Sequence, residues 1–265
     1  MRGIVVGLLL LTVTATRADD QPRALETFAI LGLEDVRLHA GAEVDTGNVG
    51  ANRGTVRLGR HAAVSGTVLG DTIELAGNNR VGSLFCHFVQ GPLRFGCATL
   101  GDPVVDVSRL SFVQVLPGSG EVHVPARTTT APLPAGAYGR VTVATRGRLL
   151  FAGGTYDLLG LDVRHHAQLL CVGRCRIRVR ERATLRSRGV IAVAAPLDGS
   201  ALRIDVESQG PRPAFVSGAH ATLAGTVYAP GGDVVLGAHG RYDGAFVGRT
   251  VTVGSGARVK LLSAF

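Results

Sequence analysis

Tryptophan is absent from the 265 residues of this sequence, and only four tyrosines are present. Aromatic rings are the usual stacking platforms for sugar rings, so a carbohydrate-cleaving enzyme finds few of them here. Such an enzyme also needs two neighbouring carboxylates, one acting as acid and the other as base or nucleophile. The acidic residues of the repeats described below occupy different repeat positions and form no such pair: Asp157, Asp162, Asp205, Asp233 and Asp243. The sequence therefore favours no catalytic site.

Paired short cysteine spacings of the CxxC kind, which mark structural zinc sites, are also missing. Four cysteines in an exported protein suggest two disulfides, although three pairings are formally possible. We favour local pairing of Cys86 with Cys97, which bracket a Gly-Pro turn, and of Cys171 with Cys175. The alternative is a metal site made from Cys86, His87 and Cys97. No cofactor is indicated.

The apolar run at residues 4–13 is too short and too interrupted for a membrane-spanning helix, which needs about 20 apolar residues. It follows a positively charged start and precedes a small residue at Ala18, as in a secretory signal peptide. We therefore expect residues 1–18 to be removed, and the alternative is an uncleaved anchor. The mature protein is expected to be secreted, periplasmic or on the cell surface, with no membrane anchor left.

Lysine is almost absent, because Lys260 is the only one among the 28 cationic residues. The formal net charge falls from +8 to +6 when Arg2 and Arg17 leave with the signal peptide. A basic exported protein can meet anionic polysaccharide, lipid head groups or stray nucleic acid. The charge singles out none of these, and no specific nucleic-acid partner is expected.

What the sequence does contain is a repeat with glycine at its corners. Residues 215–223, 234–242 and 251–259 share large apolar residues at positions 1, 3 and 9 and small residues at positions 4 and 7; only Ser217 departs from this template. The copies start about 19 and about 17 residues apart, which is the period of a solenoid coil. Strand residues two apart point to the same side. We therefore predict an all-β protein, a single right-handed parallel β-helix in which each coil forms one short rung.

The template also divides the rest of the chain. It fits residues 36–44, 56–64, 141–149, 161–169 and 177–185, and it disappears in a proline-rich stretch that holds the first cysteine pair. Proline cannot donate to a sheet ladder, so this stretch is expected to leave the solenoid. The predicted order is a signal peptide at 1–18, an N-terminal cap at 19–35, first rungs at 36–83, a disulfide-containing excursion at 84–139 and main rungs at 140–265.

Four short motifs lie within the second half of the chain: residues 122–126, the turn at 133–139, residues 153–156 and the Gly-Thr-Val-Tyr-Ala-Pro corner at 225–230. Through them the chain, from Val122 to Leu262, resembles exported bacterial proteins with glycine-rich right-handed β-helices of the cell-surface and pilus-associated type. The resemblance implies architecture and a surface location, and it brings no catalytic residues. A looser resemblance to ice-binding β-solenoids rests on residues 28–31 and the glycine-rich rungs.

Position 6 of the template carries a cation in several rungs. Because equivalent positions stack along a solenoid, these residues predict a basic ridge along one corner: His61, Arg146, His166, Arg182, His220 and His239. The plain interpretation of the ridge is a solvated turn. The functional interpretations are contact with an anionic glycan or a metal ion held by His220 and His239, and a metal would need further ligands and supporting partners.

The resulting hypothesis is a non-enzymatic structural or adhesive protein of the cell envelope or extracellular space. Its expected partner is an anionic polysaccharide or another envelope protein. One alternative is a polysaccharide lyase or hydrolase whose site lies in the 84–139 excursion. Another is an ice-binding-like surface protein. Self-association through the solenoid ends is a further expectation, because open sheet edges pair readily with other chains.

Overall fold

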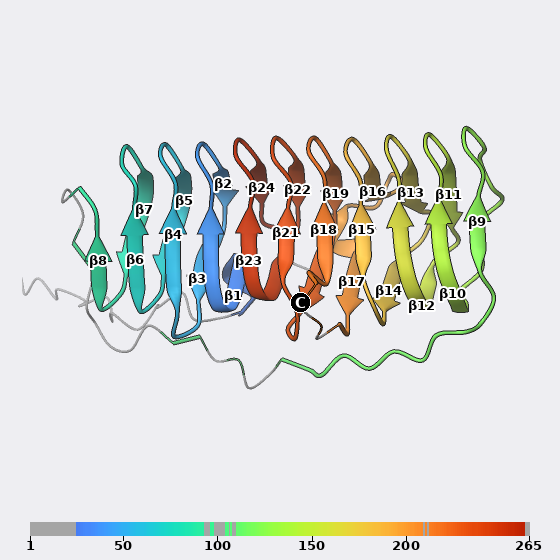
Figure 1. The fold of residues 1–265 in the computed structure, drawn as a ribbon, viewed down its shortest axis with the longest axis horizontal. Helices are drawn as coiled ribbons and strands as arrows, with labels where there is room; N and C mark the ends of the chain where they lie inside the picture. The colour runs from blue at the N-terminus through green and yellow to red at the C-terminus, as the bar shows by residue number, and fades with distance from the viewer. Residues whose placement is uncertain are drawn as a thin grey trace, which may run out of the picture.

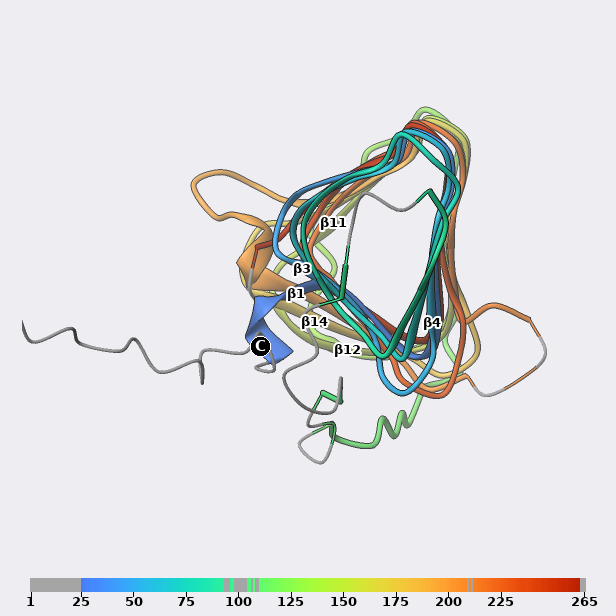
Figure 2. The same ribbon diagram turned by 90° about the vertical axis from the view of Figure 1, so that its left-hand side faces the viewer.

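The computed structural model describes residues 25–92, 96–97, 104–105, 107, 110–208, 210 and 212–262. The chain forms a right-handed parallel β-solenoid of about 11 turns, so the predicted fold is confirmed. Figure 1 shows the rungs side by side along a rod, and Figure 2 shows that the rod is triangular in cross-section. The predicted signal peptide and residues 19–24 of the predicted cap lie outside the described residues. Among the described residues, no helix is long and apolar enough to cross a membrane.

Each rung places one strand on each of three sides of the triangle, and side A is the side that faces the viewer in Figure 1. The register Val122, Val141, Leu161, Ala183, Phe215, Val234, Val251, Val36, Val56, Ile73 and Val89 runs unbroken along this side. In spatial order its strands are β8 (Phe88–Gln90), β6 (Thr72–Leu75), β4 (Thr55–Leu58), β1 (Phe28–Leu38), β23 (Phe246–Val253), β21 (Val234–Leu236), β18 (Phe215–Ser217), β15 (Ala183–Leu185), β12 (Gly154–Val163), β10 (Gly136–Val143) and β9 (Val122–Val124).

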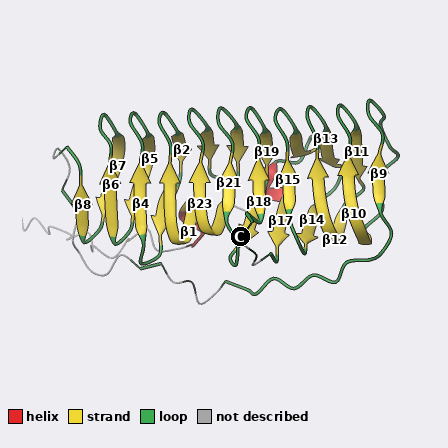
Figure 3. Cartoon of the chain, viewed as in Figure 1, coloured by secondary structure: helices red, strands yellow, loops and turns green. Residues whose placement is uncertain are grey.

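The other two sides complete the coil. Side B follows side A in each rung and contains β7 (Arg80–Phe85), β5 (Ala63–Leu69), β2 (Glu43–Thr46), β24 (Arg258–Lys260), β22 (Arg241–Asp243), β19 (Thr222–Ala224), β16 (Val190–Val193), β13 (Gln168–Cys171) and β11 (Arg148–Phe151). Side C contains β3 (Asn48–Ala51), β20 (Thr226–Ala229), β17 (Leu202–Val206), β14 (Cys175–Val179) and the bent ends of the longest strands. Two 3₁₀ turns, Leu25–Thr27 and Gly199–Ala201, are the helical elements of the described chain (Figure 3).

The rungs do not stack in chain order. Strand β1 pairs with β4 on one edge and with β23 on the other, and β2 pairs with β5 and β24 in the same way. The first rung therefore lies directly on the last rung, in the middle of the rod (Figure 1). We call this contact the joint. The two outer edges of the solenoid are β8 and β9, which precede and follow the proline-rich stretch.

Two predicted boundaries are corrected by this topology. The segment predicted as an N-terminal cap contains the start of β1, whose Phe28, Ile30 and Leu31 are fully or almost fully buried at the centre of the rod. The excursion is shorter than 84–139, because β8 continues the first rungs to Gln90 and β9 resumes them at Val122. The cap was misplaced because an excursion that returns the chain to the opposite end of the rod leaves the first rung free to meet the last rung.

Residues 110–121, which we call the strap, run along one edge of the rod (Figure 1). Val113 and Val115 are buried in a cluster with Phe28, Leu31, Leu69, Phe85, Tyr228 and Val247. The Tyr228 hydroxyl donates to the carbonyl oxygen of Ser111 at 2.6 Å, and the Val115 amide donates to Glu207 Oε2 at 2.9 Å. The strap is therefore anchored by alternate apolar side chains and by polar contacts to several rungs.

The inward positions of the template are confirmed in the three copies that define it. Val234, Leu236 and Tyr242 are buried, as are their equivalents Val251, Val253 and Val259. Each such side chain contributes on the order of 1.5 to 3 kcal/mol relative to an exposed one. Ser217, which departs from the template, is buried but satisfied: its Oγ lies 2.7 Å from the Tyr242 hydroxyl and accepts from the Gly237 amide at 2.8 Å.

Both predicted disulfides are present. Cys86 is bonded to Cys97 and Cys171 to Cys175, with sequence separations of 11 and 4 residues. The pairing removes both thiolates from the alternative metal site, and His87 instead places Nδ1 2.7 Å from Asp71 Oδ1. The metal interpretation of Cys86, His87 and Cys97 was therefore wrong.

Candidate functional site: a basic ridge and an arginine-lined groove

The corner between sides A and B repeats one backbone conformation along the rod. In most rungs one residue of the turn has a φ of +52 to +67°, the left-handed region that glycine adopts without strain. Its amide donates to a carbonyl of the next rung, as from His166 to Ser187 at 3.3 Å and from His220 to Ala238 at 2.8 Å. In spatial order the residues at this position are Arg127, Arg146, His166, Arg188, His220, His239, Gly256, Gly41, His61 and Asn78.

Five of the six residues predicted for the ridge lie at this position: His61, Arg146, His166, His220 and His239. The sixth, Arg182, does not. Residues 177–185 had been aligned to the template one side too early, because β14 belongs to side C. The true equivalents of Leu161 and Val163 are Ala183 and Leu185, which puts Arg188 at the corner.

Arg127 and Arg188 are ridge residues that the sequence interpretation missed. Both were visible in principle, because each lies three residues after the second inward residue of a side A strand, Val124 or Leu185. Arg127, Arg146, His166, Arg188, His220 and His239 are all exposed and occupy six successive rungs. We call these six residues the basic ridge. At the usual strand spacing of about 4.8 Å it extends over roughly 24 Å.

The ridge ends where the imidazole of His239 meets Gly256. The rings of His220 and His239 stack with centroids 5.3 Å apart, and a Cβ atom on Gly256 would come within 2.6 Å of His239 Nδ1. Within the part of the chain that the structure describes, no group of three or more His, Cys, Asp or Glu side chains is placed to hold a metal ion. The histidine pair thus has stacking contacts and no converging acidic or thiol ligands among those residues.

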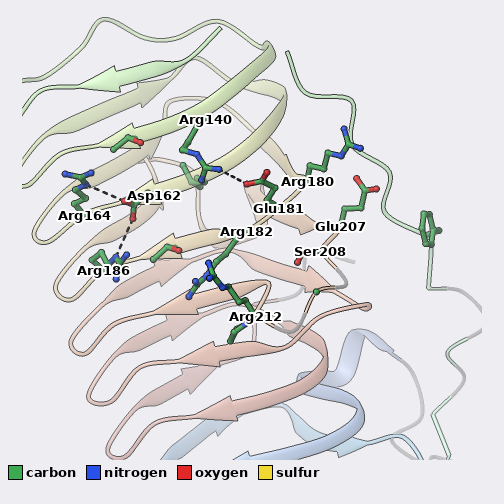
Figure 4. Close-up of a pocket in the computed structure, with 16 residues that line it drawn as sticks. Arg140, Asp162, Arg164, Arg180, Glu181, Arg182, Arg186, Glu207, Ser208 and Arg212 are labelled. Atoms are coloured by element: carbon green, nitrogen blue, oxygen red, sulfur yellow. Dashed lines mark hydrogen bonds and ion pairs between the residues drawn. The ribbon is translucent and has the colours of Figure 1, made fainter. Parts of the chain in front are cut away.

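A groove opens on side A next to the ridge, over strands β10, β12 and β15 (Figure 4). It has a volume of about 960 Å³. One wall is strap residue Phe112, and another is the segment between β17 and β18, which supplies Glu207, Ser208 and Arg212. Its charged lining consists of six arginines and three carboxylates: Arg140, Arg164, Arg180, Arg182, Arg186, Arg212, Asp162, Glu181 and Glu207.

Two of the three carboxylates already form ion pairs with arginine. Glu181 Oε2 lies 2.6 Å from Arg140 Nη2, and the Arg140 guanidinium reaches it by lying across Gly160, where a Cβ would come within 2.8 Å of Arg140 Nη1. Asp162 is shared between Arg164 at 3.4 Å and Arg186 at 3.5 Å. The third carboxylate, Glu207, accepts a hydrogen bond from the backbone amide of Val115 in the strap.

Arg182 lies in this groove, although the sequence placed it on the ridge. Its Nε is buried and has no hydrogen-bond partner among the described residues. Within the same residues, Arg180 and Arg212 have no ion pair within 4.0 Å. The groove therefore presents cationic groups that its own carboxylates do not neutralise.

Three of the other four aspartates weighed in the sequence are held by arginine in the structure, and Asp243 is the exception within the described residues. Asp205 is fully buried and lies 2.6 Å from both Arg176 and Arg203. Asp157 bonds Arg178 through both oxygens, and this hydrogen bonding raises the pKa of Arg178. Asp233 accepts from Arg249 at 2.9 Å. All of these pairs except Arg203–Asp205, which lies within β17, tie neighbouring rungs together on the outside of the rod.

Comparison with known families finds a match to the second half of the chain. Residues 137–263, just under half of the chain, match a family described as a domain of unknown function, DUF7305. The matched segment contains the groove strands β10, β12 and β15 and most of the basic ridge. No curated protein and no solved structure matches the chain.

Proposed function

We propose that this protein is a non-enzymatic structural or adhesive component of the cell envelope or extracellular space, and that it holds an anionic polysaccharide along the basic ridge. The observation that carries the proposal is the choice of residue at the left-handed corner position. Arginine or histidine occupies this position in six successive rungs. An exported location is supported by the two disulfides and by the apolar run at residues 4–13.

The corner conformation makes this choice informative. A residue with a side chain in the left-handed region costs on the order of 1 kcal/mol relative to glycine. Glycine fits the position, since Gly41 and Gly256 occupy it in two other rungs. Six side chains that each weaken the fold, all of them cationic or titratable to a cation, are better explained by a surface contact than by folding. Such strain at exposed positions is a reason to infer function.

The spacing of the ridge suits a polymer. One cationic or imidazole side chain per rung gives a row with a repeat of about 4.8 Å on a stiff support. A row of this kind matches a chain with closely repeated negative charges better than it matches a single small anion. Affinity built from many exposed charges falls steeply as salt rises.

The experiment measures retention of the purified protein on acidic and neutral polysaccharides over a range of salt concentrations. The test variant replaces Arg127, Arg146 and Arg188 by glycine, which removes three charges and relieves three strained corners. We expect retention on the acidic polymer to be lost while the midpoint of thermal unfolding stays equal or rises.

A matched control removes three charges elsewhere, with Arg57, Arg80 and Arg258 replaced by glutamine. These arginines have carboxylate neighbours within 4.0 Å and lie off the ridge. This control should keep most of the retention. Unchanged retention of the glycine variant would refute the ridge as the binding surface. The appearance of new reducing or unsaturated ends in the polysaccharide would refute the non-enzymatic assignment.

A further inference from the structure

The groove on side A differs from the ridge in shape and in charge balance. The ridge is a row of separate exposed side chains, whereas the groove is a recess whose arginines come from β10, from the turns next to β12 and β15, and from the segment after β17. Its size, about 960 Å³, is at the upper end of the range found for small-molecule sites. An inorganic anion alone would leave most of it empty.

The arginine lining of the groove favours a ligand that carries an oxyanion. Six arginines and three carboxylates line the groove, which leaves a formal excess of three positive charges, and Arg182 lines it without an ion pair among the described residues. Arginine donates in a planar fork that matches carboxylate and phosphate oxygens. The carboxylates of the groove are engaged with Arg140, Arg164, Arg186 and the strap amide. A ligand that neutralises the remaining positive charge of the groove must therefore bring its own negative charge.

The lining of the groove also includes one aromatic ring, that of Phe112. Phe112 projects from the strap and is 75% exposed, although the alternate strap residues Val113 and Val115 are buried. An exposed aromatic ring at the edge of a polar recess is suited to packing against the apolar face of a sugar ring. Leu116, which is 72% exposed on the same strap, does not line the groove.

From these arginines and Phe112 we infer that the groove is a second binding site, which takes a short acidic saccharide with a carboxylate on Arg182 and a sugar ring against Phe112. The site goes beyond the proposed function of the ridge, because it recognises a short saccharide and not the charge of a long polymer. It is built partly from the strap, so the strap contributes a ligand contact as well as spanning the rungs.

The test uses the full-length protein and a short probe, a trisaccharide of galacturonate, with binding followed by calorimetry. Arg182→Gln should weaken binding at least tenfold, because it removes a charge-assisted contact and leaves the carboxylate without its partner. Arg57→Gln, which makes the same charge change outside the groove, should bind like the parent. Phe112→Ala should weaken binding several-fold, and Leu116→Ala should not.

Other results of these binding measurements would contradict the site or the class of its ligand. Equal affinity of the Arg182 variant with an unchanged melting midpoint, or equal affinities of the two strap variants, would overturn the assignment. Inorganic phosphate that displaces the trisaccharide at matching concentration, or a neutral trisaccharide that binds equally well, would overturn the acidic-sugar class. The glycine variant of the ridge should bind the trisaccharide normally, which separates a failure of this site from a failure of the ridge.

Discussion

The joint between the first and last rungs allows a direct test by an engineered disulfide. Arg37 on β1 and Thr252 on β23 are adjacent in register, and both side chains point outward from side A. Neighbouring strands lie about 4.8 Å apart, inside the Cα separations of 4.4 to 6.8 Å over which cysteines can be bridged. We therefore expect the double variant Arg37→Cys, Thr252→Cys to form an intramolecular bond.

The same cysteine pair distinguishes the joint from an arrangement in which the rungs stack in chain order. In that arrangement the first and last rungs would lie at opposite ends of a rod on the order of 50 Å long, far beyond disulfide reach. The new bond closes about 215 residues, so a chain-entropy model gives a stabilisation of about 5 kcal/mol. Its signature is a higher denaturant midpoint under oxidising conditions that is lost on reduction.

Peptide mapping without reduction identifies the bond, and dilution with size-exclusion chromatography separates it from links between molecules. The control is Arg37→Cys with Thr142→Cys, since Thr142 occupies the same outward ladder but lies on β10, several rungs away. That pair should stay as free thiols. Free thiols in the Arg37 and Thr252 variant after oxidation of the folded protein would refute the joint.

Three further outcomes are expected. Val251→Asp, at a buried position of the last rung, should destabilise the protein by on the order of 5 kcal/mol, whereas the outward Thr252→Asp should change its urea midpoint little; equal tolerance would contradict the inward position of Val251. Burial raises the pKa of Tyr242 to about 12, so the stability it contributes is present below pH 10 and is lost as pH rises through 12. The Tyr242→Phe variant should therefore lose about 2 to 3 kcal/mol less stability than the parent protein when the pH is raised from 8 into the alkaline range, as measured by urea unfolding. An alkaline loss equal to that of the parent would argue against this cause. Removing both cysteines of the 11-residue disulfide should cost about 3 kcal/mol and removing the 4-residue one about 2 kcal/mol, and the reverse order in denaturant unfolding would contradict the loop-length argument.

The coil and its inward residues were predictable because they follow from local periodicity. Val234 and Leu236, two apart in β21, face the core for the same reason that Val251 and Val253 do. The phase of one rung was not predictable from apolar spacing alone. Ile177 and Val179 form as good an alternating pair as Ala183 and Leu185, and a small alanine at the inward position disguised the true copy.

The order of the rungs was hidden for a different reason. The end of β1 presents Val36 and Leu38 inward, and almost any other rung of this protein presents the same apolar pair in the same register. Parallel pairing between coils of nearly identical shape therefore carries little local information on which coil is the neighbour. The groove was hidden too, because its lining residues come from three strands and the turns next to them, a connecting segment, and a strap separated from them by tens of residues.

The joint also accounts for the limits of the basic ridge. The two rungs that meet there are the ones with Gly256 and Gly41 at the corner position, and the Gly256 amide donates to the carbonyl oxygen of Ala40 across the joint at 3.1 Å. Pairing these rungs brings together segments more than 200 residues apart, so it must offset a large loop-closure entropy. Left-handed arginine or histidine at the two corners would subtract on the order of 1 kcal/mol each from that contact. The same left-handed corner conformation is thus occupied by glycine at the joint and by cationic or imidazole side chains in the six rungs on one side of it. Glycine avoids strain where the first and last rungs must pair, and the strain is present where side chains are needed on the surface.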